Sequence, residues 1–135
     1  MTSPAAALKE AIRTRLAADA AVLALLREAK VYLDPPRHAA FPYIAFAESN
    51  QRDNGTSSED GHITELALAI WSRGNGSAEG LAIADAVSMS LASPLVTATG
   101  HRVINFLVLG IQPQPQKDTD TWRTIIRLRV VTEVL

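Results

Sequence analysis

The stretch that carries the clearest structural signal lies near the C-terminus and reads WRTIIRLRVVTEV, residues 122–134. Its side chains alternate in character from one residue to the next. One set is mostly apolar and comprises Trp122, Thr124, Ile126, Leu128, Val130, Thr132 and Val134. The other set carries most of the charge and comprises Arg123, Ile125, Arg127, Arg129, Val131 and Glu133. Because successive side chains of a strand point to opposite faces of a sheet, this pattern predicts a strand with a core face and an arginine face.

Two other segments upstream also predict strands. Residues 62–72 alternate, with Thr64, Leu66, Leu68 and Ile70 sharing one face. Residues 103–111 are nearly all apolar, which predicts a strand covered on both faces or central in the sheet. Between this segment and the last strand, Gln112–Asp118 is polar and contains two prolines, so we expect a protruding connector that includes Gln114 and Lys117.

The N-terminal third predicts helix followed by short strands. Ser3 and Pro4 form a good helix start, and an apolar residue recurs every four positions at Leu8, Ile12 and Leu16. Asp19 is placed to cap a second short helix, although one continuous helix to about Glu28 is equally compatible with the sequence. Brief strands are expected at 31–33 and, opened by a proline, at 42–47.

Two polar segments separate the predicted helices and strands in the middle of the chain. Residues 49–61, which include Arg52 and Asp53, have no large apolar side chain and predict a mobile loop. This loop is either a solvated connection or a segment that orders on binding. After the turn residues 73–76, Ser77 is expected to cap a helix that Pro94 ends. The stripe of this helix comprises Leu81, Ala84, Val87, Ser88 and Leu91.

This order of elements predicts an α+β fold, with an antiparallel or mixed sheet of about four to five strands and two main helices on one face. The length of 135 residues favours a single domain spanning 1–135. With 13 Lys and Arg against 14 Asp and Glu, the formal net charge of -1 gives no global attraction for nucleic acid. The absence of cysteine excludes disulfides and thiolate sites, and the lack of a signal peptide or membrane span favours a cytoplasmic origin.

The sequence offers little for catalysis. The three histidines, His38, His62 and His101, are far apart and lack the paired spacing of metal ligands, so we expect surface histidines and neither metal nor cofactor. No Gly-x-Ser-x-Gly motif is present, and Gly74-Asn75-Gly76 lacks the lysine of a phosphate loop. We therefore expect no catalytic residue.

The arginines of the last strand leave three interpretations open. They form a solvated sheet face, an interface with carboxylates of another subunit, or a contact with DNA. For the interface interpretation, the candidate residues are Arg52, Asp53, Gln114, Lys117, Arg123, Arg127, Arg129 and Glu133.

Several segments together resemble the tail-terminator family of long-tailed phages, also called tail-completion or tail-to-head joining proteins, which occur in prophages and gene transfer agents too. The likeness rests on the N-terminal amphipathic helix, on Phe41-Pro42-Tyr43-Ile44, on Leu68-Ala69-Ile70-Trp71-Ser72-Arg73, and on Leu128-Arg129-Val130-Val131-Thr132-Glu133. It spans nearly the whole chain, and these short apolar motifs describe a fold and not an active site.

The resemblance implies a structural protein of a virion or phage-like particle, assembled in the bacterial cytoplasm. It implies a homo-oligomeric ring, typically a hexamer, at the head-proximal end of the tail tube. Such a ring stops polymerisation of the major tail-tube protein and docks the head connector, while DNA passes through its lumen. The alternatives are a small α+β dimer that binds a ligand or acts on it, and the connector's stopper protein.

Overall fold

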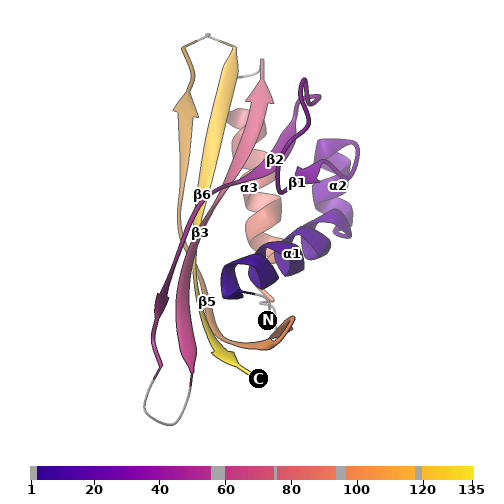
Figure 1. Ribbon diagram of the computed structural model, residues 1–135. Coiled ribbons are helices and arrows are strands. Elements are labelled where there is room, and N and C mark those ends of the chain that lie inside the picture. The colour runs from indigo at the N-terminus through magenta and orange to yellow at the C-terminus, as the bar shows by residue number, and fades with distance from the viewer. Residues whose placement is uncertain (1–2, 56–59, 75, 94–96, 118–119) are drawn as a thin grey trace.

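The computed structural model describes residues 3–55, 60–74, 76–93, 97–117 and 120–135. The strands form one mixed sheet, and the helices lie on one of its two faces (Figure 1). The elements are α1 (Pro4–Ala17), α2 (Ala20–Leu26), β1 (Val31–Tyr32), β2 (Tyr43–Asp53), β3 (Gly61–Arg73), α3 (Ala78–Ser90), β4 (Thr97–Ala98), β5 (His101–Pro115) and β6 (Thr121–Val134). The predicted α+β fold is confirmed.

The order of strands across the sheet is β1-β2-β3-β6-β5-β4. β3 and β6 are its central antiparallel pair, matched in register from Gly61 opposite Glu133 to Arg73 opposite Thr121. β2 and β5 flank this pair, each antiparallel to its neighbour, whereas the two-residue β1 runs parallel to β2. The four long strands therefore alternate in direction across the sheet.

Two of the three expected helix caps are present. The Ser3 hydroxyl accepts a hydrogen bond from the Ala6 N–H (3.1 Å), and the Asp19 carboxylate accepts one from the Val22 N–H (3.0 Å). The Asp19 cap marks α2 as a separate helix and settles the choice between one helix and two. Ser77 occupies the predicted N-cap position of α3, but its side chain makes no capping hydrogen bond to the helix.

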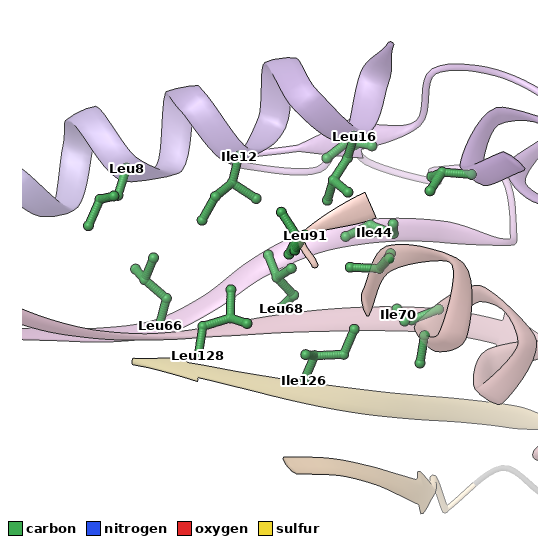
Figure 2. Close-up of a cluster of buried hydrophobic side chains, with 14 of the residues drawn as sticks. Leu8, Ile12, Leu16, Ile44, Leu66, Leu68, Ile70, Leu91, Ile126 and Leu128 are labelled. Atoms are coloured by element: carbon green, nitrogen blue, oxygen red, sulfur yellow. The ribbon is translucent and has the colours of Figure 1, made fainter. Parts of the chain in front are cut away.

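The main core lies between the helices and the sheet. Leu8, Ile12 and Leu16 line one side of α1, and they face alternate residues of the two central strands (Figure 2). Those strand residues are Leu66, Leu68 and Ile70 of β3 with Ile126 and Leu128 of β6. The four-residue spacing of the helix and the two-residue spacing of the strands thus meet in one apolar layer, and burying each such side chain contributes about 1.5–3 kcal/mol.

Helix α3 packs closely on the central strands because of a glycine. A Cβ atom at Gly80 would lie 2.4 Å from the Thr124 hydroxyl oxygen. Ile83, Ala84 and Val87 are buried beneath this helix, whereas Leu81, expected on the same stripe, is 41% exposed. The buried face is therefore rotated relative to the predicted one.

The predicted loop at 49–61 was wrong over much of its length. β2 continues through Asp53, which lies opposite His62 of β3, and β3 begins at Gly61. These polar residues form a strand because β3 supplies partners for their backbone groups, a tertiary effect that overrides low strand propensity. Residues 56–59 lie outside the described residues.

The strand predicted at 103–111 is confirmed, but its expected covered or central position and the connector expected at 112–118 were wrong. Both segments contribute to one strand, β5, which pairs with β6 from His101 to Pro115. β5 is not a covered central strand, because among the described residues β4 pairs with it only at His101 and Arg102. An uninterrupted apolar run has the same local pattern at the edge of a sheet as in its centre. Pro94 and Asp118 lie outside the described residues.

Candidate assembly surfaces

The sheet face turned away from the helices carries the arginines of β6, and we call it the arginine face. Residues opposite one another on paired strands share a face. The register therefore places Arg52, Gln114, Arg123, Arg127, Arg129 and Glu133 on the arginine face. Asp53 lies opposite His62 on the other face, and Lys117 follows the end of β5, so six of the eight predicted interface residues are brought together.

Arg127, near the middle of this face, forms an ion pair with Glu48. The guanidinium donates to the carboxylate at 3.0 Å, and both side chains are more than half exposed. A β-bulge between Phe46 and Ser49 shifts the register of β2 next to Glu48. The residue's own backbone N–H and then Arg127 hold the pKa of the Glu48 carboxyl below its usual value. An ion pair this exposed contributes little to stability, about 0–1 kcal/mol.

A second ion pair neutralises the neighbouring part of the face. The Arg52 guanidinium lies 2.9 Å from the Glu65 carboxylate, between β2 and β3. Glu65 also lies opposite Arg129 of β6 in the register. The Arg129 side chain is half-buried. Further along β6, Glu133 pairs with Arg102 of β5. Acidic residues of the same chain thus accompany several of the arginines.

The opposite end of the arginine face is aromatic. The Arg123 guanidinium lies 5.6 Å from the centre of the Trp71 ring and donates to the Gln114 side chain at 3.4 Å. Trp71 in turn stacks on Tyr43, with ring centres 6.4 Å apart. Below this group, Ala67, Ala69 and Ile125 form a second small buried cluster. The face is therefore a mixed polar and aromatic surface and not a uniform band of positive charge.

The interpretation of the sequence missed the two edges of the sheet. β5 exposes apolar side chains on both of its faces: Ile104 (50%), Leu107 (43%), Val108 (39%), Leu109 (53%) and Ile111 (40%). The run from Val103 to Gln116 contains no charged residue. On the other side of the sheet, β1 pairs with β2 only at Ile44 and Ala45, so within the part of the chain that the structure describes β2 beyond that point is also an edge. Edge strands of soluble proteins usually carry charges that discourage pairing, and β5 lacks them.

A signal for the β5 edge was present in the sequence. The Gln116 N–H donates to the Thr121 carbonyl (3.0 Å), so Gln116 turns its backbone groups toward β6. Because these groups alternate in direction along a strand, Pro113 and Pro115 turn theirs to the open side. Proline lacks an N–H and is tolerated within strands at such edge positions. Two prolines at alternate positions next to an apolar run therefore indicate an edge strand.

Two of the three histidines, His62 and His101, lie near one another. His101 is 1% exposed, so the expectation that it lies at the surface was wrong. Its Nδ1 lies 3.0 Å from the Thr99 carbonyl, and its ring centre is 6.5 Å from that of His62. Within the described residues, no group of three His, Cys, Asp or Glu side chains is placed to hold a metal ion.

One surface hollow of about 320 Å³ opens beside the Glu48–Arg127 pair. Its lining comprises Glu48, Ser49, Asn50, Glu65, Leu66, Ala67, Leu109, Arg127 and Leu128, and it includes no histidine. Among the described helices, none is long and apolar enough to cross a membrane.

Comparison with known proteins identifies the fold and the family of the chain. No curated protein matches the chain. A chain in a solved structure described as the virion of a native gene transfer agent particle has a TM-score of 0.88 and 22% sequence identity; the match covers 98% of this chain and 99% of that one. This likeness shows the fold. The family model for the tail completion protein gp17 matches residues 10–133. The chain therefore belongs to the tail completion protein gp17 family and is a structural protein of the tail of a virion or phage-like particle.

Proposed function

We propose that this protein is a tail terminator, copies of which close into a ring on the tail. The ring binds the head-proximal end of the tail tube, stops addition of tube subunits and docks the head connector. The observation that carries this proposal is the family match over residues 10–133, because it involves nearly the whole of the given sequence.

The surfaces of the chain support a ring of identical copies. A closed ring needs two unlike patches on each copy, which meet head to tail. This chain offers an apolar strand edge at β5 and a polar strand edge at β2, on opposite sides of one sheet. We propose six copies, the number that the resemblance to tail terminators implies.

The partners follow from the position in the tail. One side of the ring contacts the major tail-tube protein, and the other contacts the head connector. DNA passes through the lumen, and the formal net charge of -1 on each copy limits attraction to a passing phosphate backbone.

The alternative of a ligand-binding dimer or enzyme needs a deep pocket that holds a histidine beside a carboxylate. The His101 ring lies beside the Thr99 carbonyl and the His62 ring. No specific observation favours this alternative over the structural role.

The test is polymerisation of purified tail-tube subunits with and without the protein. We expect the protein to cap one end of each tube, to shorten the tubes, and to appear as a ring at that end in negative-stain images. A protein that stays monomeric and also leaves tube length unchanged would contradict the proposal. A monomer in solution alone would not, since a ring can close on its template.

A further inference from the structure

The two open edges of the sheet lie at the same level along the strands. The register runs in one row from Asn50 of β2 through Glu65 and Arg129 to Leu107 of β5. A neighbouring row runs from Arg52 through Ile63 and Val131 to Asn105. The open part of β2, residues 46–53, is therefore opposite the open part of β5, residues 103–111, across the full width of the sheet.

The two edges also run in opposite directions. β2 is antiparallel to β3, β3 to β6, and β6 to β5, so β5 ascends in Figure 1 where β2 descends. Rotation of a second copy about an axis along the strands brings its β2 beside β5 of the first copy at the same level. The resulting pair is antiparallel, which permits regular hydrogen bonds between the strands.

The side chains permit this pairing. All residues of β2 from Glu48 to Asp53 are exposed. Its three charged residues are already engaged within the chain: Glu48 with Arg127, Arg52 with Glu65, and Asp53 with the Gly55 N–H at 3.0 Å. The uncharged β5 edge can therefore pair with β2 of another copy without burying an unpaired charge. Above it, Pro113 and Pro115 remove N–H groups from the open side, which confines pairing to the apolar part of β5.

We infer that residues 103–111 of β5 pair with residues 46–53 of β2 of a second copy of this chain, so that the sheets of successive copies join into one continuous belt. The inference rests on the proposed ring and specifies its subunit interface. It accounts for an exposed apolar edge about 30 Å long at about 3.3 Å per residue, which in a monomer would be a site of aggregation.

The absence of cysteine allows a direct test by disulfide trapping. Two variants place cysteines in the two rows described above: Asn50→Cys/Leu107→Cys and Arg52→Cys/Asn105→Cys. Within one copy, each pair is three strand spacings apart, about 14 Å, which no disulfide can span. Opposed residues of an antiparallel pair have Cα atoms about 4.5–5.5 Å apart, which a disulfide does span. Any bond must therefore join two copies.

Rings are first confirmed by negative stain, free or bound to tail tubes, and are then oxidised and run on a denaturing gel. We expect a ladder of covalent multimers up to the ring number from at least one of the two variants, and its collapse by reductant. A control, Leu107→Cys/Met89→Cys, moves the second cysteine to an exposed position on α3 and should give no ladder.

Three results would overturn the inference. Intact rings without a ladder from either variant would leave the terminator role standing and remove this interface. A dimer from Leu107→Cys alone would show β5 paired with β5, and a ladder from the Met89 control would show β5 docked on the helices. Absence of rings both in solution and on tubes would reject the interface together with the proposed function.

Discussion

At the scale of single residues, Gly80 decides how closely α3 approaches the sheet. Its missing Cβ leaves room for the Thr124 hydroxyl, and the Ser72 hydroxyl lies 3.4 Å from the same point. Glycine in a helix interior normally costs about 0.5–1 kcal/mol relative to alanine. We expect the close contact with β6 to outweigh helix propensity at this position, which lies in the first turn of α3.

We predict that Gly80→Ala lowers the free energy of unfolding by about 1–3 kcal/mol, because the new methyl group forces α3 and Thr124 apart. Chemical denaturation measures the change. Gly110→Ala is the matched control, since no heavy atom lies within 4 Å of its added Cβ. The Gly80→Ala/Thr124→Ala variant should recover part of the loss. A stabilised Gly80→Ala protein would show that propensity and not the contact dominates.

At the scale of elements, the start of α2 depends on a single carboxylate. The hydrogen bond from the Val22 N–H holds the pKa of Asp19 below its ordinary value of 3.8. A carboxyl whose pKa is lowered by folding stabilises the folded state fully above its ordinary pKa, and the effect is lost as the pH falls through the lowered value. The Ser77 side chain makes no such bond at α3.

We predict that Asp19→Ala lowers the free energy of unfolding by about 1 kcal/mol at pH 7 and by progressively less below pH 3.8. Ser77→Ala should change it by a few tenths of a kcal/mol at most, because no cap is lost. Thermal unfolding across pH values measures both. Asp19→Asn keeps a capping side chain without the charge, so its difference from Asp19→Ala should not vary with pH. Equal costs for Asp19→Ala and Ser77→Ala would refute this account of the caps.

At the scale of the whole molecule, the arginine face and the strand edges serve different contacts in our proposal. The edges join copies of the chain, and the arginine face remains available to other components of the tail. Because Arg127 and Arg129 lie on the surface of a paired strand, changing their charge should leave the core intact.

We predict that Arg127→Glu/Arg129→Glu weakens binding to tail tubes while the unfolding temperature falls only slightly, because the Arg127–Glu48 ion pair is exposed. The control Arg27→Glu/Arg37→Glu makes the same change in net charge at exposed positions at the end of α2 and in the connection that follows β1. Loss of assembly in both variants would indicate a general effect of charge. Normal assembly by the Arg127 and Arg129 variant would identify the arginine face as a solvated surface.

The sequence by itself determined the helices and strands in which apolar residues recur at a regular spacing. The alternation in β3 and β6 and the four-residue spacing of Leu8, Ile12 and Leu16 follow from local geometry, and so do the caps at Ser3 and Asp19. The resemblance of the short motifs to tail-terminator proteins also came from the sequence, and the family match confirms it.

Only the tertiary structure decided which strands lie at the edges, that the polar residues of β2 join the sheet, and that His101 is buried. An apolar run such as residues 103–111 reads the same whether a neighbour covers it or not, because the covering strand is distant in sequence. The level and direction shared by the β2 and β5 edges likewise depend on the pairing of four strands across the sheet. Local sequence patterns specify which face of a strand is apolar. Pairing between strands that are distant in sequence specifies which strands lie at an edge and keep unpaired backbone N–H and C=O groups.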